Sequence, residues 1–516
     1  AGRAGSAFVT SRVGGHWQVI PADALGLVGT GRLDARLFDV TALLADGYGD
    51  DRRTDLPLIV RYTGASERGS DEAALGRRGA KLTRRLPRID ASAVHAAQRD
   101  LPGFWTASTT GSGTGRRGLR PGVAGVWLDA RITPTLDTSV PAVGAPAAWA
   151  AGLTGTGVGV AVLDTGVDAT HPDLTAAITA SANFTSDPDL SDLVGHGTHV
   201  ASTIVGSGTA SGSGTASGGG TASGGGYRGV APDARLLVGK VCTIWGCLAS
   251  DVIAGMEWAA AQQHAKVVNL SLGDVDTPGD DPVEAALTRL TAEFGTLFVV
   301  AVGNEGADGT IGSPADVDAA LAVAATDRAG QVAEFSSRGP RAGDAGLKPD
   351  LAAPGVDITA ARSSTGYLGE PGQSYTTMSG TSMAAPHVAG VAVLLAQQHP
   401  DWSPARLKAA LMASARPVAG VDAYAQGAGM VNAAAAIGQT LTAQPASVSF
   451  GRAGWPHDDD QTITRTVTFG NDGTAPLPLA LGLTTTGPGA GATPAGMFTL
   501  SAPSLTVPAG GTASVT

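Results

Sequence analysis

The chain has 516 residues, which is enough for more than one domain and for a large buried core. Its 43% hydrophobic and 15% charged residues exclude a largely disordered protein. The formal net charge of −11 argues against nucleic acid as a partner. No apolar run approaches the roughly 20 residues of a transmembrane helix, so we expect no membrane span.

Residues 1–133 have the pattern of a small α+β unit. Runs rich in β-forming residues, separated by turn residues, occur at 7–13, 35–41, 56–63 and 122–128. Residues 90–100 (DASAVHAAQRD) have helical spacing of apolar side chains, so we expect a helix there. The Gly-rich stretch 111–118 is expected to be a flexible link.

Charge is distributed unevenly along the chain. Residues 1–130 contain 18 Lys and Arg against 13 Asp and Glu, whereas the remainder is acidic. A basic front could attract an acidic body, although a drift in surface composition gives the same pattern. The chain begins Ala-Gly-Arg without an apolar signal segment, so we expect either a removed export signal or a sequence that starts late.

Residues 134–444 have the pattern of a doubly wound α/β domain. Continuous apolar runs, typical of strands buried on both faces, occur at 157–164, 235–241, 266–272 and 296–302. Helical patterns lie between them at 251–264 and 281–294. This alternation predicts a mostly parallel sheet, which binds ligands beyond the carboxyl ends of its strands.

Two shorter segments of this domain have an unusual composition. Residues 206–226 repeat Gly, Ser, Thr and Ala, so we expect a mobile surface loop without chemistry. The two cysteines, Cys242 and Cys247, are too few for a four-ligand zinc site. They indicate either a local disulfide in a secreted protein or two free thiols in a cytosolic one.

Residues 445–516 change to an all-β pattern. Short strand-like runs alternate with Gly, Pro, Asn and Asp, which is typical of a β-sandwich. The last residues stop within such a run. We therefore expect a sandwich that is cut short here, and a natural protein that continues.

Three segments of the central domain carry residues suited to nucleophilic catalysis. Asp164 ends a buried strand, His196 lies among glycines at the start of a helical pattern, and Ser382 begins a long apolar helical pattern. A serine hydroxyl is a poor nucleophile until a base accepts its proton, and the base needs an orienting acid. The chain order Asp, His, Ser and the missing G-x-S-x-G motif argue against an α/β-hydrolase.

The segments DTG, HGTH and GTSMAAPH resemble the three catalytic motifs of subtilisin-like serine peptidases, over about residues 140–440. The resemblance implies that Asp164 orients the base, His196 is the general base and acid, and Ser382 is the nucleophile. Asn304, in VVAVGNEG, matches the oxyanion-hole asparagine of the family. The resemblance also implies that no cofactor takes part in the chemistry.

Further positions match substrate-binding segments of the same family. The segment NLSLG resembles the strand that pairs with the substrate backbone, and small residues near Asn304 resemble the primary specificity pocket. The candidate substrate-binding residues are Ser271, Leu272, Gly273, Ala301, Gly303 and Gly312. A roomy pocket implies a preference for large apolar or aromatic side chains, and Glu305 at its mouth could also admit basic ones.

Other polar residues are expected to be structural. His199 and His387 lie close to the motifs but fit packing within helices better than catalysis. Asp173 matches a calcium ligand of the family, so structural calcium is one option. The loop that would complete that calcium site is not recognisable in the sequence, and the Gly/Ser-rich repeat stands near its place.

The resemblance implies a role for each of the three regions. Residues 1–133 fit a prodomain that assists folding, blocks the cleft and is cut off within about 128–140; the alternative is an accessory domain that is never removed. Residues 134–444 are the peptidase domain, and residues 445–516 resemble a fibronectin-like sandwich.

The function that follows is a secreted serine endopeptidase, made as a zymogen, that acts on protein or peptide substrates. Two alternatives remain at this stage. One is a catalytically silent relative that binds peptides or surfaces, and the other is a different serine hydrolase such as an esterase.

Overall fold

The structure is a computed structural model of residues 1–516. It describes residues 7–13, 16–45, 48–49, 54–86, 90–110, 117–128, 136–211, 226–276, 281–457, 460–485, 487, 491 and 493–516. Most of the expected link at 111–118 and most of the Gly/Ser repeat lie outside these residues, and Gly118 begins the short strand β7 (Gly118–Leu119). The chain divides into two compact units, Ala1–Thr133 and Pro134–Thr516, which are described separately.

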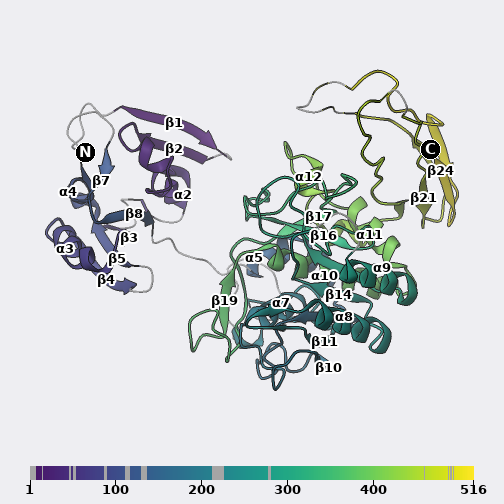
Figure 1. The fold of residues 1–516 in the computed structure, drawn as a ribbon, viewed down its shortest axis with the longest axis horizontal. Helices are drawn as coiled ribbons and strands as arrows, with labels where there is room; N and C mark the ends of the chain where they lie inside the picture. The colour runs from purple at the N-terminus through teal and green to yellow at the C-terminus, as the bar shows by residue number, and fades with distance from the viewer. Residues whose placement is uncertain are drawn as a thin grey trace. The chain divides into compact units, whose positions relative to one another are not determined.

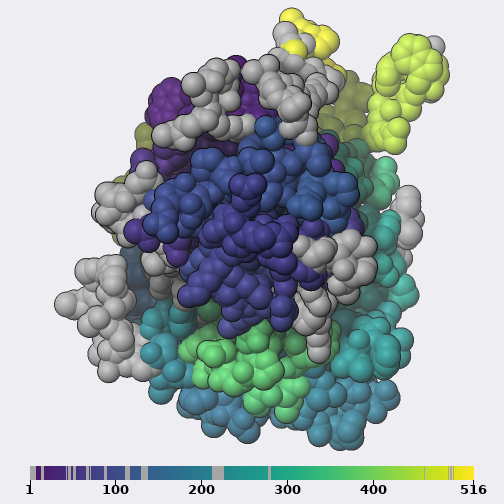
Figure 2. Space-filling model, turned by 90° about the vertical axis from the view of Figure 1, so that its left-hand side faces the viewer, coloured from purple at the N-terminus to yellow at the C-terminus, as the bar shows by residue number. Residues whose placement is uncertain are grey.

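The first unit contains a four-stranded antiparallel sheet in the order β4-β5-β3-β8. The strands are β3 (Asp55–Tyr62), β4 (Ala80–Leu86), β5 (Ala91–Ala97) and β8 (Val123–Leu128). Helices α3 (Ala65–Gly76) and α4 (Leu101–Ser108) accompany the sheet, and β1 (Phe8–Val13) pairs with β2 (His16–Pro21) in a hairpin. In the space-filling view this unit, coloured purple to blue, is one packed body (Figure 2).

Two expectations for this unit were wrong. Residues 90–100 do not form a helix, because Ala91–Ala97 is the strand β5, paired on both sides by β3 and β4. Small residues buried on both faces fit a central strand, and tertiary pairing outweighs the helix propensity of alanine. Residues 35–41 form a 3₁₀ turn at Ala35–Phe38 and the start of helix α2 (Val40–Ala45), not a strand. The side chain of Asp34 accepts a hydrogen bond from the Arg36 N–H and so favours this turn.

The second unit is built on a seven-stranded parallel sheet in the order β10-β11-β9-β14-β15-β16-β17 (Figure 1). The strands are β9 (Gly159–Asp164), β10 (Ile178–Asn183), β11 (Arg235–Lys240), β14 (Val267–Leu270), β15 (Leu297–Ala301), β16 (Leu321–Thr326) and β17 (Leu351–Pro354). The central strands are buried along their whole length, which confirms the doubly wound α/β fold expected from their continuous apolar runs.

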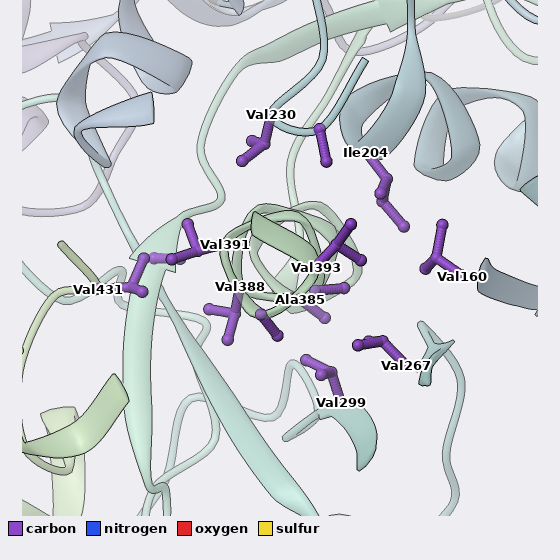
Figure 3. Packing of buried hydrophobic residues seen from close by; sticks show 14 of the residues in the cluster. Val160, Ile204, Val230, Val267, Val299, Ala385, Val388, Val391, Val393 and Val431 are labelled. Atoms are coloured by element: carbon purple, nitrogen blue, oxygen red, sulfur yellow. The ribbon is translucent and has the colours of Figure 1, made fainter. Parts of the chain in front are cut away.

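Helices cover both faces of this sheet. On one face, side chains of α7 (His196–Val205) and α10 (Thr381–Gln398) pack against Val160, Val267 and Val299 (Figure 3). On the other face, α8 (Ala249–Glu257) and α9 (Pro282–Phe294) pack against the alternate residues of the same strands. Because α10 is apolar all round, it lies within the core, and its first turn is held rigidly at the sheet edge.

The remaining elements refine the expected pattern. The helix expected at 251–264 is observed as α8 followed directly by a π-helical turn, Trp258–Gln262. The C-terminal region forms a three-stranded antiparallel sheet of β20 (Leu441–Gln444), β21 (Val467–Asn471) and β24 (Thr512–Val515). A separate pair joins β22 (Leu477–Ala480) and β23 (Ser504–Val507). Among the described residues, no helix combines the length and apolarity needed to cross a membrane.

Candidate active site

The sequence candidates gather at the carboxyl edge of three neighbouring strands. Asp164 is the last residue of β9, Ser271 follows β14, and Asn304 follows β15. These strands are parallel neighbours, so their carboxyl ends meet at one edge. His196 begins α7 and Ser382 lies in the first turn of α10, which brings both helix starts to the same region.

Asp164 and His196 are joined directly. The His196 Nδ1 lies 2.8 Å from Asp164 Oδ1 and 3.0 Å from Oδ2. Asp164 is almost fully buried, whereas the His196 side chain is 23% exposed. Burial lowers the pKa of His196, but the charge of Asp164 and its hydrogen bond raise it, and Asp192 adds to this. The net effect is a pKa above the ordinary histidine value of 6.5.

Sequence reasoning missed Asp192, which organises both segments. Its Oδ1 accepts from Thr165 Oγ1 at 2.8 Å and from the Gly195 N–H at 2.7 Å. Its Oδ2 accepts from the N–H and Oγ1 of Thr198 at 2.8 and 2.6 Å. Asp192 is fully buried, so its charge is balanced by these four donors, two of which are backbone N–H groups at the start of α7. The signal in the sequence was an acid placed four residues before His196.

Ser382 and Ser271 hold each other at the sheet edge. The Ser382 hydroxyl donates to the Ser271 carbonyl oxygen at 3.1 Å, and the Ser271 hydroxyl donates to the Ser382 carbonyl oxygen at 2.8 Å. Within the part of the chain that the structure describes, no hydrogen bond joins Ser382 Oγ to His196. In this structure the Ser382 hydroxyl therefore points to the backbone oxygen of Ser271, the residue that follows β14.

Asn304 has a fixed amide orientation. Its Oδ1 accepts from the N–H of Thr381 at 2.9 Å and from Thr381 Oγ1 at 3.1 Å. Thr381 is fully buried and its hydroxyl also contacts the Gly303 carbonyl oxygen at 3.2 Å. Because the oxygen is committed to Thr381, the exposed Asn304 amide leaves its Nδ2 donors beside the start of α10, where a Cβ on Gly380 would lie 3.8 Å from Nδ2.

The glycines among the substrate candidates lie where two loops approach closely. Asp274 and Ser313 exchange backbone hydrogen bonds of 3.1 and 3.0 Å. A Cβ on Gly273 would lie 2.7 Å from the Ser313 carbonyl oxygen, and a Cβ on Gly312 would lie 2.7 Å from that of Asp274. Both positions therefore need glycine for the loops to pair.

The other substrate candidates line the same edge. Ala301 ends β15 and is buried, and Leu272 is half-buried beyond β14. Gly303 has a positive φ of 103°, and a Cβ there would lie 2.9 Å from Ser337 Oγ.

The two histidines outside the motif positions have structural partners. His199 is fully buried and its Nε2 lies 2.9 Å from the Ile358 carbonyl oxygen, and burial lowers its pKa to about 3. His387 contacts the Met383 carbonyl oxygen and Ser139 Oγ, and burial lowers its pKa to about 4. Both rings are therefore neutral and engaged within helix packing.

The surroundings of Asp173 fit a hydrogen-bonded carboxylate better than a calcium ligand. Its Oδ2 accepts from the Tyr375 hydroxyl at 2.7 Å, and its Oδ1 accepts from the Ala210 N–H at 2.8 Å. Burial and this carboxylate raise the pKa of Tyr375, so the hydroxyl stays a donor. A calcium ion would need the carboxylate oxygens of Asp173 as ligands, but hydrogen-bond donors already contact both of these oxygens.

The two cysteines lie in one hairpin. β12 (Cys242–Thr243) pairs with β13 (Gly246–Cys247), and a disulfide joins Cys242 to Cys247. Trp245, at the tip, is 90% exposed.

Comparison with known proteins shows which family the chain resembles. The family model described as "Subtilase family" matches residues 155–464. An alkaline protease of Alkalihalobacillus alcalophilus is 40% identical over 62% of this chain and 75% of its own length. Subtilisin Savinase of Lederbergia lenta is 40% identical over 57% of this chain and 95% of its own. Serine protease AprX of Bacillus subtilis (strain 168) is 36% identical over 60% and 73%, respectively.

Proposed function

This chain belongs to the subtilase family of serine endopeptidases, and we propose that Ser382 is its nucleophile, His196 its general base and acid, and Asp164 the orienting acid. The observation that carries the assignment is the 2.8 Å contact between His196 Nδ1 and Asp164 Oδ1. With Nδ1–H donated to the carboxylate, the neutral imidazole has its lone pair on Nε2, where it can accept the serine proton.

The reaction proceeds in two steps. Ser382 Oγ rotates from the Ser271 carbonyl oxygen towards His196 Nε2, attacks the substrate carbonyl carbon and transfers its proton to the imidazole. His196 gives that proton to the amine nitrogen as the scissile C–N bond breaks. The same imidazole then deprotonates a water that attacks the acyl carbon, and it returns this proton to Ser382 Oγ as the ester bond breaks. Subtilases need no cofactor for this chemistry.

Asn304 stabilises the oxyanion of the tetrahedral intermediate. Its Oδ1 is held by Thr381, which favours presenting Nδ2 as a donor to the developing charge. The Ser382 backbone N–H, in the first turn of α10, supplies a second donor at a helix N-terminus.

The substrate is a protein or peptide in extended form. Ser271, Leu272 and Gly273 continue β14 and offer the backbone edge for an added strand. Ala301, Gly303 and Gly312 form the wall of the pocket for the side chain before the scissile bond. Because these wall residues are small, the pocket favours large apolar or aromatic side chains.

Residues 1–133 act as a prodomain, and the enzyme is secreted as a zymogen. The separate compact unit with its own hydrophobic core, which precedes the peptidase domain, supports this role. Part of the expected cleavage region at 128–140 lies outside the described residues. The C-terminal β-sheets form an appended domain that contacts substrate or surface, and the disulfide of Cys242 and Cys247 suits an oxidising compartment.

The proposal is tested with the full chain and two serine variants. Ser382→Ala removes the proposed nucleophile. Ser379→Ala is the control, because Ser379 is an exposed serine three residues earlier whose hydroxyl accepts a hydrogen bond from the Asp357 N–H. After incubation at neutral pH, the wild type and Ser379→Ala should digest casein and lose roughly their first 130 residues by intact mass, because the segment after residues 1–133 is itself cut at the active site. Ser382→Ala should stay whole and inactive. Casein hydrolysis by Ser382→Ala contradicts the assignment, and hydrolysis by an unprocessed wild type makes residues 1–133 an accessory domain.

A further inference from the structure

Three carboxylates converge beside the loops of the candidate substrate pocket. Asp276, Glu284 and Asp316 each place one oxygen so that all three oxygens lie within 4.8 Å of one another. They come from separate segments: the loop after β14, the first turn of α9, and the loop after Gly312. Like charges at this spacing repel, so the arrangement requires a compensating positive charge or proton.

Glu284 and Asp316 are buried, and each leaves one carboxylate oxygen without a donor. Glu284 is 1% exposed; its Oε2 accepts from the Asp281 N–H at 2.9 Å, and its Oε1 has no hydrogen-bond partner. Asp316 is 9% exposed and its Oδ1 likewise has no partner. A buried acceptor without a donor is costly, which indicates that a ligand belongs at these oxygens.

Nearby basic side chains are committed elsewhere. Arg341 pairs with Asp318 and Asp344, and it reaches only the backbone oxygen of Asp316. Lys348 is buried against Asp350. Among the described residues, no Lys, Arg or His side chain forms an ion pair with Glu284 or Asp316.

We propose that Asp276, Glu284 and Asp316 bind a calcium ion. An all-oxygen set of three carboxylates suits a hard cation, whereas zinc prefers nitrogen and sulfur ligands. A hollow of about 380 Å³, lined by Asp276, Asp316, Asp318 and Arg341 among others, gives ions a path from solvent and room for the waters that complete the coordination of calcium.

The bound ion ties three segments together behind the pocket. Asp276 lies three residues after Gly273, and Asp316 lies four residues after Gly312. Ser313 Oγ also donates to Asp281, the N-cap of α9, at 2.7 Å. The ion therefore braces the two loops that contain Gly273 and Gly312. The role of these loops in a substrate pocket rests on the proposed function, whereas the binding of the ion does not.

The test measures calcium binding in the Ser382→Ala full chain, so that autolysis and catalysis do not enter. Metal-free protein is dialysed against calcium chloride, and bound calcium per chain is determined by elemental analysis. Glu284→Gln and Asp316→Asn should each bind one ion fewer than the parent and lose most of the calcium-induced rise in Tm. The control Glu293→Gln, an exposed acid on the same helix, should bind as the parent does.

Equal calcium content in the parent, Glu284→Gln and Asp316→Asn would overturn the proposal and leave a shared proton as the compensating species. If neither variant folds, a long-wavelength anomalous map of calcium-soaked parent crystals decides. It should show a peak about 2.3–2.6 Å from oxygens of the three carboxylates. A map without that peak contradicts the proposal.

Discussion

Asp192 accepts a 2.8 Å hydrogen bond from Thr165 Oγ1 and thereby links the segment of Asp164 to the helix of His196. Thr165 directly follows Asp164, and its hydroxyl also accepts from the Gly197 N–H at 3.0 Å. The segments of Asp164 and His196 are therefore positioned against each other by a buried carboxylate.

Removing the charge of Asp192 should weaken both stability and catalysis. In Asp192→Asn, an amide N–H₂ replaces one acceptor oxygen and leaves buried donors at Gly195 or Thr198 unpaired. We expect a loss of about 3 kcal/mol, since these are bonds to a charged acceptor, and a fall in Tm of about 4 °C in the Ser382→Ala background. Calorimetry checks this, with the exposed Asp189→Asn as the matched control. Equal Tm values for the two variants would mean that Asp192 is not a structural link.

The raised pKa of His196 sets the acid limit of activity. The imidazole must be neutral to accept the serine proton, so kcat/KM should fall as pH drops through a pKa that lies above 6.5. Asp164→Asn removes the charge that raises this pKa. The residual activity should be lower by about 10⁴-fold, with its acid limb shifted to lower pH. An acid limb in the same place for both enzymes would argue against Asp164 as the partner of His196. The surface variant Asp233→Asn should retain the wild-type profile.

Asn304→Ala should lower kcat with little change in KM, because the amide acts on the transition state. The expected loss is about 10²- to 10³-fold, the value known for subtilisin itself. Thr381→Val keeps the backbone N–H bond to Asn304 and removes the hydroxyl bond, so its loss should be only several-fold. Steady-state kinetics on one peptide substrate compares the three enzymes. Unchanged kcat in Asn304→Ala would remove the amide from the oxyanion site.

The disulfide should stabilise the peptidase unit only modestly. Cys242 and Cys247 are five positions apart, and closing so short a loop contributes about 2 kcal/mol through the unfolded state. The double variant Cys242→Ser and Cys247→Ser, in the Ser382→Ala background, should therefore melt about 2–3 °C lower. The same shift should appear when the parent is reduced. A much larger loss would mean that the hairpin holds more of the structure than its cross-link.

The fold of the second unit could be predicted because its signals are local and mutually consistent. The continuous apolar runs at β9, β11, β14 and β15 have one reading, strands buried on both faces. In the first unit, the helix predicted at 90–100 was wrong because Ala91–Ala97 is rich in alanine, which favours a helix locally. Its strand state is set by pairing on both sides, with the adjacent strand β4 and with β3, which is distant in sequence and leaves no local signal.

The same division holds for the candidate site. Motifs predicted Asp164, His196, Ser382 and Asn304 as candidates, because each lies in a short distinctive segment. Positioning groups such as Thr381 could not be recognised, since their roles depend on which side chain lies opposite them. The carboxylate cluster was missed for the same reason: Glu284 and Asp316 are 32 positions apart and look like surface acids in the sequence.

Fluorophosphonate labelling, mapped by peptide mass, tests whether Ser382 is the activated nucleophile of a serine endopeptidase. A fluorophosphonate reacts with a serine only where a base and an oxyanion site activate it. We predict one label per processed chain, located on the peptide containing Ser382, and a labelling rate that falls at acid pH with protonation of His196. A label on another serine, or an unlabelled chain, would contradict the account.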